Sequence, residues 1–470
     1  MKYDLVCGLE THVELSSKSK IFCGCTTEFG GEPNTHCCPV CLGHPGTLPV
    51  LNREVVNLAV MAGLALNCKI QNFSKMDRKN YSYPDLPKAY QISQFDMPLC
   101  KDGFLTLSSG KRIRIERIHI EEDAGKLVHT EKGILIDCNR AGVPLIEIVT
   151  KPDISSIDEA KEYVTKLQQI MRYIGVSDCK MQEGSMRCDV NISVKPHGES
   201  VPGIRTEIKN MNSVSNMAKA MEYEYKRQCA LIEKGEKVTQ ETLRFNDAEG
   251  TTSSMRSKED ADDYRFFPEP DLVNIVLTDA EINGIRANLP ELPQSRVKRY
   301  TEELGLSTEE ALHLTKYRNI SDYFERALKG TQSAKLLANF IIGQIFATFK
   351  TEGEKEAFSP LTTPSQLCDL VKLLEDKKIN KNLAKITLDK MLKSGNPCTE
   401  YLSDEDMSVV EESTLRAFCR EAAEENTKAA QDYRNGKEKA LMAILGTVMK
   451  KSKGKADGEK ALEIIKEILG

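Results

Sequence analysis

The sequence contains little that would place it in a membrane or direct it out of the cell. Its longest apolar stretch, LAVMAGLAL at 58–66, is far shorter than the roughly 20 residues of a membrane span. The first fifteen residues contain acidic side chains and no long apolar core, so we expect no signal peptide. The net charge of −5 gives no global attraction to nucleic acid or lipid. We expect a cytosolic protein with no membrane contact.

The familiar phosphate-binding and hydrolase motifs are also missing. The sequence has no G-x-x-x-x-G-K-[ST] loop, no G-x-G-x-x-G, no G-x-S-x-G and no H-E-x-x-H. If the chain handles ATP, it must therefore do so on a sheet-based surface and not in a P-loop or Rossmann site. Fifteen cysteines in a chain of 470 residues, without an export signal, indicate reduced thiols and a possible metal site.

The chain is long enough to divide into two to four domains, and the secondary structure expected from its sequence changes along its length. Short β-like segments dominate up to about residue 292, where a proline-rich stretch marks a boundary, and amphipathic helices follow. We expect an α+β fold with domains at 1–292, 293–402 and 403–470. Strands are predicted at 5–15, 112–121, 143–150, 185–194 and 205–210, and helices at 52–66, 156–175, 215–235, 321–330 and 335–349.

Four cysteines form the pattern C-x-C-x12-C-x2-C between residues 23 and 41: Cys23, Cys25, Cys38 and Cys41. Two pairs of thiolates on tight turns can converge tetrahedrally on Zn²⁺. Four thiolates leave no open position on the metal, which favours a structural over a catalytic site. Two alternatives remain open: cysteines that bind no metal, and an iron–sulfur cluster. Cys37, beside Cys38, leaves the choice of ligand uncertain by one position.

Carboxylates and one imidazole suggest a second metal site. Glu10 and His12 lie two residues apart on a predicted strand, so both project from one face, and Glu14 continues that face. Glu147 interrupts the apolar strand VPLIEIVT, where a buried carboxylate requires a cation, a base or water. A third source is the acidic run Glu121, Glu122 and Asp123. These ligands suit Mg²⁺ or Mn²⁺. Solvated acids in surface salt bridges are the alternative.

Other polar residues could line a cleft with these acids. In the strand SMRCDVNISV, Arg187, Asp189 and Asn191 share one face, and Lys209 stands in the segment EIKNMNS. Such groups can contact phosphate or carboxylate, although an ordinary exposed sheet face has the same composition. Near the C-terminus, residues 404–425 have eight acids against two arginines, whereas residues 428–460 have nine basic residues against four acids.

Several long segments together resemble the B-subunit family of the aspartyl/glutamyl-tRNA amidotransferases, and the resemblance covers essentially the whole chain. The matching stretches are GLETHVEL (8–15), EPNTHCCPVCLGHPGTLPVLN (32–52), DRKNYSYPDLPKAYQISQFDMPL (77–99), HIEEDAGK (119–126), NRAGVPLIEIVTKPDI (139–154), EGSMRCDVNIS (183–193), EIKNMNS (207–213), DDYRFFPEPDL (262–272) and DYRNGKEKALMAILGTVMKKSKGKAD (432–457).

The resemblance implies a glutamine-synthetase-like antiparallel-sheet cradle domain, then a helical domain and a small helical tail. It also implies a cytoplasmic ligase that acts in a heterotrimer with two further subunits, A and C. ATP phosphorylates the side-chain carboxylate of Glu-tRNA(Gln) or Asp-tRNA(Asn), and ammonia from glutamine hydrolysis in the amidase partner, the A subunit, then displaces phosphate. The activation is needed because a carboxylate would otherwise have to lose oxide. Magnesium neutralises charge during the phosphoryl transfer.

The resemblance also assigns roles to individual residues. The magnesium ligands map to Glu10, His12, Glu122 and Glu147, with Glu121 and Asp123 as possible substitutes. Lys79 and Tyr81, in the DRKNY segment, would lie along the cleft or the ammonia path. Some family members lack the four cysteines, which is consistent with a structural role for zinc. The basic tail, in particular Lys450, Lys451, Lys453 and Lys455, would meet tRNA phosphates.

Three rival interpretations make different predictions. The related archaeal E subunit has an inserted synthetase-like domain, for which the direct run from PEPDL (268–272) to ELPQSR (291–296) leaves no room. A stand-alone ATP-dependent ligase or aminoacyl-tRNA synthetase would need an adenylation motif, which the sequence does not show. A zinc-stabilised RNA-binding module would bind tRNA without any ATP hydrolysis that depends on glutamate or aspartate.

Overall fold

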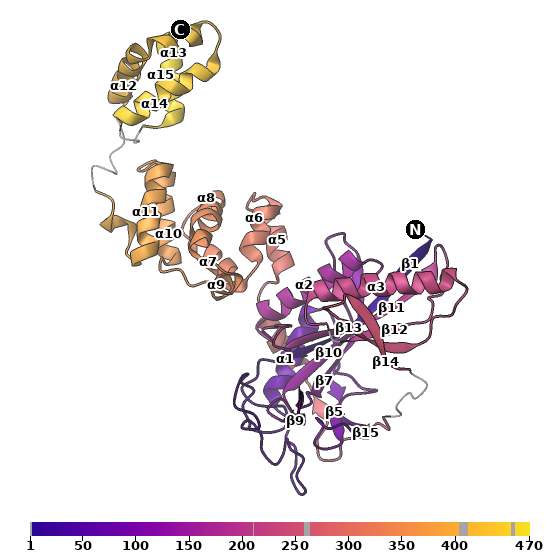
Figure 1. Ribbon diagram of the computed structural model, residues 1–470. Helices are drawn as coiled ribbons and strands as arrows, with labels where there is room; N and C mark the ends of the chain where they lie inside the picture. Colours follow the sequence, from indigo (N-terminus) through magenta and orange to yellow (C-terminus); the bar gives the residue numbers. More distant parts are fainter. Residues whose placement is uncertain (1, 210, 258–263, 404–411, 453–455) are drawn as a thin grey trace. The chain divides into compact units, whose positions relative to one another are not determined.

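The computed structural model describes residues 2–470 apart from 210, 258–263, 404–411 and 453–455 (Figure 1). This part of the chain divides into two compact units, 1–292 and 293–470. The first mixes strands and helices, and the second is built from helices wherever the structure describes it. The fold is therefore α+β, as predicted. None of the helices described is both long and apolar enough to cross a membrane.

The first unit is built on a large sheet with the strand order β14-β13-β12-β11-β1-β10-β7-β6-β2. Neighbouring strands run antiparallel except β12 and β13, which are parallel. The strands are β1 (Tyr3–Glu14), β2 (Lys69–Ile70), β6 (Cys100–Thr106), β7 (Arg112–Glu122), β10 (Pro144–Thr150), β11 (Met186–Pro196), β12 (Thr206–Lys209), β13 (Glu241–Asn246) and β14 (Thr251–Ser257).

The two faces of the sheet differ because side chains alternate along each strand. In β1, Leu5, Leu9 and Val13 are buried in the hydrophobic core, while Glu10 and His12 lie on the opposite face. Helices α1 (Arg53–Ala65), α2 (Ile157–Tyr173) and α3 (Val214–Glu233) pack their apolar sides into the same core. The polar face is thereby left for a binding site.

The helices begin where side chains can cap them. The side chain of Ser156 accepts a hydrogen bond from the Glu159 N–H at the start of α2, and Ser213 accepts one from Asn216 at the start of α3. These bonds satisfy amide groups that have no partner inside the helix. A fourth helix, α4 (Asp279–Ala287), starts with a capping box between Thr278 and Glu281. Caps of this kind fix where each helix starts.

The first unit also contains smaller sheets besides the main one. One has the order β15-β4-β5, with β15 at Phe267–Pro268, β4 at Asp77–Asn80 and β5 at Tyr90–Ser93. A second pairs β3 (Phe73–Ser74) with β16 (Ile275–Val276), and a third is the hairpin of β8 (Lys126–Thr130) and β9 (Gly133–Asp137). The first of these sheets matters for function, because it brings residues from 77–93 next to residues just before Phe267.

The second unit contains two separate hydrophobic cores. One lies within residues 300–402 and the other within 415–469. Its α-helices are α5 (Pro293–Glu302), α6 (Thr308–Thr315), α7 (Arg318–Leu328), α8 (Ala334–Phe340), α9 (Glu352–Ala357), α10 (Pro364–Glu375), α11 (Lys381–Ser394), α12 (Glu412–Glu425), α13 (Thr427–Arg434), α14 (Leu441–Lys451) and α15 (Gly458–Leu469). A division of this unit near residue 402 remains a prediction.

Most predicted elements are confirmed to within a few residues, including the strands at β1, β7, β10, β11 and β12 and the helices α1, α2, α3 and α7. The predicted single helix at 335–349 is the exception. The α-helix ends at Phe340, and the chain continues as a π-helical turn, Ile341–Ile345, and a short 3-10 turn. The apolar pattern alone could not separate these geometries, because all three keep apolar residues on one side.

Tyr163 on α2 provides a test of the core packing. Its side chain is fully buried, and its hydroxyl has no hydrogen-bond partner among the described residues. An unsatisfied buried hydroxyl costs about 1–3 kcal/mol. We therefore predict that Tyr163→Phe raises the free energy of unfolding, measured by thermal or guanidinium denaturation.

Tyr323 is the matched control, since its buried hydroxyl donates to the Thr362 carbonyl at 3.0 Å. Tyr323→Phe should lower the stability by about 1 kcal/mol. A destabilised Tyr163→Phe variant would contradict the assignment of Tyr163 as unsatisfied.

Candidate active site and metal centre

The registers of four adjacent strands line up polar residues across the polar face of the main sheet. His12 on β1 is paired with Glu147 on β10 and with Arg187 on β11. Glu147 is paired in turn with His119 on β7. Because paired residues project from the same face of a sheet, these side chains form one row. Glu121, two residues after His119, lies beside this row on the same face.

Three of these residues form a possible metal site. His12, Glu121 and Glu147 each offer a ligand atom, and the three atoms lie within 4.8 Å of one another. His12 Nε2 is 3.5 Å from Glu121 Oε1 and 3.7 Å from Glu147 Oε2. An imidazole with two carboxylates is a donor set that suits a hard divalent cation such as Mg²⁺ or Mn²⁺. Both carboxylates are buried, so they need a nearby positive charge.

In the protein alone, that charge comes from His119. Its Nε2 lies 3.1 Å from Glu147 Oε2 and 3.6 Å from Glu121 Oε2. Burial by itself would lower the pKa of His119, but Glu147 and Glu121 raise it to about 9. The same contacts lower the pKa of Glu147 despite its burial. The other ring nitrogen, Nδ1, is buried and has no partner in the described chain. His119 thus acts as an internal counter-cation for the two acids.

Glu10 lies two residues before His12 on β1, and it is paired with Asp189 on β11. Asn191 Nδ2 donates to Glu10 Oε1 at 2.8 Å. Burial raises the pKa of Glu10, and the charge of Glu147 adds to the shift. Lys209 Nζ is 2.6 Å from Asp189 Oδ2 and 2.8 Å from Glu207 Oε1. Glu10 is therefore near the three-residue group without belonging to it.

A cleft of about 450 Å³ opens over this face. It is lined by acids and bases from the main sheet, by Lys79 on β4, and by aromatic residues that flank β5 and β15. Lys79 Nζ stands 4.8 Å from the ring centre of Tyr264 and 5.8 Å from that of Tyr81. Burial raises the pKa of Tyr81, which keeps its phenol neutral. The lining residues that also appeared in the sequence predictions are Glu10, His12, Lys79, Glu147 and Lys209.

A second cavity of about 490 Å³ adjoins the cleft and shares Glu10 and Arg117 with it. Its wall includes Asn191 and a segment at 202–205 that contributes Gly203 and Arg205. The cavity is lined by the basic side chains Arg117 and Arg205, by the acids Glu10 and Glu116, and by Gly8 and Gly203, which carry no side chain. It therefore offers room, beside two guanidinium groups, for a ligand that continues from the cleft.

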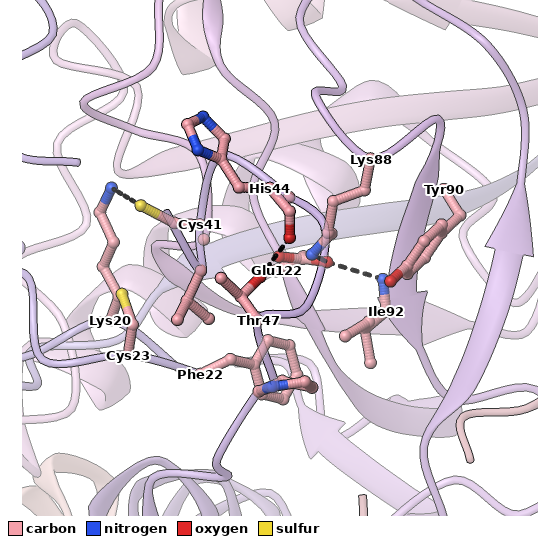
Figure 2. Close-up of a pocket in the computed structure, with 14 residues that line it drawn as sticks. Lys20, Phe22, Cys23, Cys41, His44, Thr47, Lys88, Tyr90, Ile92 and Glu122 are labelled. Atoms are coloured by element: carbon pink, nitrogen blue, oxygen red, sulfur yellow. Dashed lines mark hydrogen bonds and ion pairs between the residues drawn. The ribbon is translucent and has the colours of Figure 1, made fainter. Parts of the chain in front are cut away.

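Glu122 does not join His12 and Glu147, in contrast to the predicted grouping. Residues alternate along β7, so Glu121 shares the face of His119 and Glu122 points away from it. The Glu122 carboxylate accepts a hydrogen bond from the Ile92 N–H at 2.9 Å and pairs with Lys88 (Figure 2). It lines a different cavity of about 100 Å³. Because side chains alternate along β7, Glu121 and not Glu122 belongs to the group with His12 and Glu147.

Asp123 and Arg187 form an ion pair at the edge of the site. Arg187 Nη2 lies 2.7 Å from Asp123 Oδ2, and Arg140 Nε lies 3.5 Å from the same oxygen. Asp123 raises the pKa of Arg187 even though burial opposes the shift. Arg187, predicted to line the cleft, is thus held by an acid that was considered as an alternative metal ligand. Its position in the register still places it next to His12.

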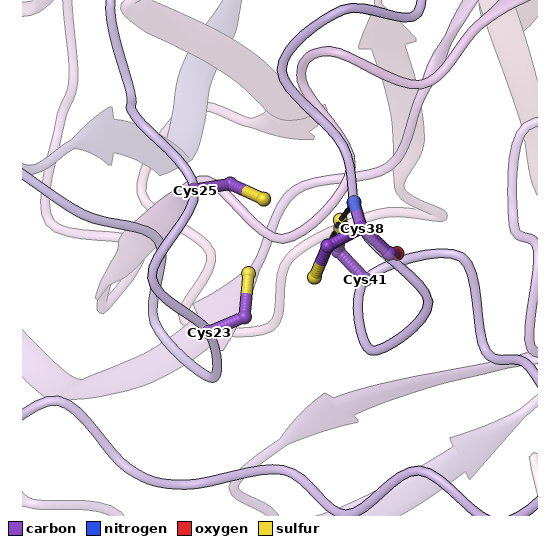
Figure 3. Close-up of side chains that lie close together, drawn as sticks. All are labelled: Cys23, Cys25, Cys38 and Cys41. Atoms are coloured by element: carbon purple, nitrogen blue, oxygen red, sulfur yellow. Dashed lines mark hydrogen bonds between the residues drawn. The ribbon is translucent and has the colours of Figure 1, made fainter.

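The four cysteines of the sequence pattern come together in one group (Figure 3). The sulfur atoms of Cys23, Cys25, Cys38 and Cys41 lie within 4.8 Å of one another. The Cys38 N–H donates to Cys41 Sγ at 3.1 Å, a contact that favours the thiolate form. Cys37 is turned away, with its sulfur 3.2 Å from the Asn34 carbonyl oxygen. The group could therefore bind a metal through the four predicted cysteines, and Cys37 is outside it.

Lys20 connects this group to the rest of the unit. Its side chain is fully buried, and its Nζ lies 3.7 Å from Cys41 Sγ and 3.4 Å from the Cys138 carbonyl oxygen. A hydrogen bond with Cys23, together with the charge of Lys20, lowers the pKa of Cys41 to about 4. Lys20, Cys41 and Glu122 line the same small cavity (Figure 2). The cysteine group and the end of β7 therefore border the same cavity.

The predicted tRNA-contacting lysines lie at the end of α14 and beyond it. Lys450 is exposed. Lys451 pairs with two acids of α12, at 2.6 Å from Glu421 and 2.7 Å from Glu425. Lys453 and Lys455 lie outside the described residues. Part of the basic charge of this segment is thus balanced by the acidic segment that precedes it.

Comparisons with known proteins show the family of the chain. Residues 5–283 match the family model described as GatB/GatE catalytic domain, and residues 322–469 match the GatB domain. This chain belongs to the B-subunit family of the tRNA amidotransferases.

Similar curated proteins carry the name of the B subunit of an aspartyl/glutamyl-tRNA(Asn/Gln) amidotransferase. The one from Thermoanaerobacter sp. (strain X514) is 51% identical over 474 residues, covering 100% of each chain. That from Caldicellulosiruptor saccharolyticus is 49% identical, covering 100% of this chain and 99% of the relative. That from Clostridium tetani is 48% identical, with 99% of both covered.

Several site residues escaped the sequence predictions. His119 stands in the segment RIHIEE, where its two-residue spacing from Glu121 already places both on one face. That signal was present in the sequence, because an imidazole between isoleucines is as unusual as the acid in PLIEIVT. Lys20, Lys88 and Phe95 gave no comparable signal. Each stands in an ordinary loop context, and only the folded chain brings it to a cavity.

The Lys88–Glu122 pair allows a test of the assigned geometry. Both side chains are nearly inaccessible, with exposed fractions of 11% and 5%. Removal of one partner leaves a buried, unpaired charge, which costs about 3–5 kcal/mol. We predict that Lys88→Met lowers the free energy of unfolding by that amount in denaturant titrations. The double variant with Glu122→Gln should recover part of the loss.

The exposed pair Lys226–Glu222, at 2.7 Å, serves as control. Because surface ion pairs contribute about 0–1 kcal/mol, Lys226→Met should change stability little. Equal effects of Lys88→Met and Lys226→Met would show that Glu122 is not held by Lys88.

Proposed function

We propose that this chain is the B subunit of a tRNA-dependent amidotransferase and phosphorylates the side-chain carboxylate of Glu-tRNA(Gln), Asp-tRNA(Asn) or both. Ammonia then replaces the phosphate to give Gln-tRNA or Asn-tRNA. The activity requires a cytoplasmic heterotrimer with two partners, the glutaminase (A) and a small third chain (C). The observation that carries the proposal is the group His12, Glu121 and Glu147, two of whose members, His12 and Glu147, line a cleft together with Lys79, Arg117 and Lys209, in a chain of this family.

We assign Mg²⁺ to this group, with Glu121 in place of Glu122. The donor set fits the ion, since two carboxylate oxygens and one imidazole nitrogen are close enough to share it. When bound, the ion would neutralise charge on the phosphoryl oxygens during transfer. Glu10, with its raised pKa, lies near enough to contribute through its carboxylate or through a water ligand. The hydrogen bond that fixes its carboxylate comes from Asn191, which lines the adjoining cavity.

The cleft's own side chains can bind and orient the two substrates. Lys79 and Arg117 present positive charge near the acids, and Lys209 adds a third cation held by Asp189. These charges suit ATP phosphates and the substrate carboxylate. ATP would extend from the cleft into the adjoining cavity, where Arg205 and the Gly203 backbone can contact it. Phosphoryl transfer from ATP to the carboxylate yields ADP and an acyl phosphate, and attack by ammonia releases inorganic phosphate.

We also propose a domain organisation of a glutamine-synthetase-like cradle at 1–292, a helical domain at 293–402 and a tRNA-binding tail at 403–470. The sheet, antiparallel except at β12 and β13 and with one polar face, supports the first part. The separate hydrophobic cores at 300–402 and 415–469 support the division of the rest. In the tail, Lys450, Lys451, Lys453 and Lys455 would contact tRNA phosphates, with an affinity that falls as salt rises.

Substitution at Glu147 tests the proposed reaction. Glu147→Gln keeps the shape of the side chain but removes the charge that would hold the ion. We predict a loss of amidation of roughly 10²–10³-fold, as for other groups that stabilise transition-state charge. The assay combines the assembled heterotrimer with Glu-tRNA(Gln), glutamine and Mg-ATP, and follows Gln-tRNA(Gln).

Glutaminase activity should remain at least partly intact in this variant, because glutamine hydrolysis occurs in a partner chain. Glu131→Ala, at the exposed turn of the β8–β9 hairpin, is the control and should leave both activities unchanged. Full amidation by Glu147→Gln, or a parallel loss of glutaminase, would contradict the role given to Glu147.

We assign structural Zn²⁺ to the four cysteines. The sulfur geometry and the nearby ammonium of Lys20 both suit a negatively charged tetrathiolate. We predict about one zinc per chain by elemental analysis, and loss of this zinc in Cys38→Ser. Cys229→Ser, outside the group, should keep the metal.

Because zinc does not touch the carboxylates of the cleft, its loss should reduce local stability more than catalysis. Faster proteolysis of residues 20–50 in Cys38→Ser would report the local effect. A chain that contains iron instead of zinc, or no metal at all, would contradict the assignment.

A further inference from the structure

One wall of the active-site cleft is aromatic, which the carboxylate chemistry on its floor does not explain. Phe95 follows β5, and Tyr264 and Phe266 precede β15, so the wall belongs to the small sheet β15-β4-β5. The rings of Phe95 and Phe266 are stacked, with centroids 4.3 Å apart and planes at 10°. Tyr264 meets Phe266 edge-on, with centroids 6.1 Å apart. All three residues line the cleft.

This wall is exposed but held in place. Phe95 is 59% exposed, although it stands at the mouth of a polar cleft. Its backbone N–H donates to Asp77 Oδ2 at 3.0 Å, and Asp77 is itself buried and paired with Lys75. Phe266 supports one face of the Phe95 ring. Core packing cannot account for a large apolar ring that remains mostly in solvent, whereas a ligand with a flat face can.

The charges beside the wall indicate what kind of ligand fits. Lys79 stands beside the wall, with its Nζ 4.8 Å from the Tyr264 ring centre, and it lines the same cleft as Glu10, His12 and Glu147. A ligand in this cleft thus meets an aromatic surface at one side and cations with a metal group at the other. A nucleoside that carries an acidic group has this combination, because every base offers a π-face for stacking.

The proposed reaction, on which this inference rests, brings two adenosines to the site: the one in ATP and the one at the 3′ end of tRNA. Phosphoryl transfer is roughly in line, so the attacking carboxylate and the leaving ADP lie on opposite sides of the phosphorus. The cavity with Arg205 and Gly203 adjoins the cleft through Glu10 and Arg117 and has room for the nucleotide. The aromatic wall then remains free for the 3′ end of the tRNA, which carries the carboxylate that accepts the phosphoryl group.

We propose that Phe95 and Phe266 form a stacking platform for the 3′-terminal adenine of the aminoacyl-tRNA. The base continues the stack on Phe95, and the attached amino acid reaches past Lys79 toward the acids on the sheet. The platform recognises the end that all tRNAs share. It therefore supplies affinity and orientation, and leaves discrimination between tRNAs to other contacts.

Phe95→Ala in the assembled amidotransferase tests the platform. A lost base–aromatic stack should raise KM for Glu-tRNA(Gln) by roughly 5- to 150-fold. The KM for ATP and the glutaminase activity should stay within about twofold of the unmodified enzyme. Phe95→Tyr keeps a flat ring and should restore the KM for Glu-tRNA(Gln). Phe73→Ala, which removes another exposed phenylalanine outside the cleft, is the matched control.

An inhibitor series tests the base directly. A non-hydrolysable adenosine with glutamate in amide linkage at its 3′ position should inhibit amidation less strongly in Phe95→Ala than in the unmodified enzyme. The same compound without its base should inhibit both enzymes equally. This comparison depends on the ligand and remains informative if the variant enzyme is partly impaired.

Each other outcome overturns the proposal in a recognisable way. A raised KM for ATP with unchanged KM for Glu-tRNA would assign the platform to the ATP adenine. Weaker assembly with the partner chains would make the wall a protein-docking surface. Unchanged kinetics in both Phe95→Ala and Phe266→Ala would show that no base stacks there. If the unmodified complex does not amidate Glu-tRNA or Asp-tRNA, the proposed function fails, independently of the platform.

Discussion

The site depends on one constraint, the antiparallel register of β7, β10, β1 and β11. This register sets His12, Glu147 and His119 side by side in one row, and the two-residue repeat of β7 adds Glu121. A shift of one residue in any of these strands would turn its polar side chains into the core and its apolar ones into the cleft. The hydrophobic core on the other face prevents such a shift. Packing on one side of the sheet thus maintains the geometry of the chemistry on the other.

The same geometry imposes an electrostatic requirement. Buried carboxylates are stable only with nearby positive charge, and the chain supplies it from His119, Lys79 and Lys209. His119 balances Glu121 and Glu147 in the protein alone, which gives it a role that a divalent ion can share or replace. Under the proposed function, these charges prepare the cleft for a cation and for anionic substrates before either arrives. This local arrangement explains how a chain with a net charge of −5 can present a site suited to phosphate.

The cysteine group and the active site are separate in chemistry but connected in structure. Lys20 contacts Cys41 and lines the same small cavity as Glu122, the neighbour of Glu121 on β7 (Figure 2). Glu122 therefore has a different environment from Glu121, although the two are adjacent in sequence. Glu121 lies on the strand face that carries His119 and Glu147, whereas Glu122 is held by Lys88 and the Ile92 amide on the opposite face.

The sequence by itself determined the α+β class, most strands and helices, the four cysteines, and the face shared by Glu10 and His12. These depend on local periodicity and on spacing, which a sequence displays directly. Tertiary structure alone decided that Glu121 rather than Glu122 meets His12 and Glu147, because the phase of a strand relative to its partners is set by register. It also brought Lys20, Lys88, Phe95 and Phe266 to their cavities from loops and edges of small sheets. Such residues carry no periodic signal, since their positions are fixed by contacts between segments that are far apart in the chain.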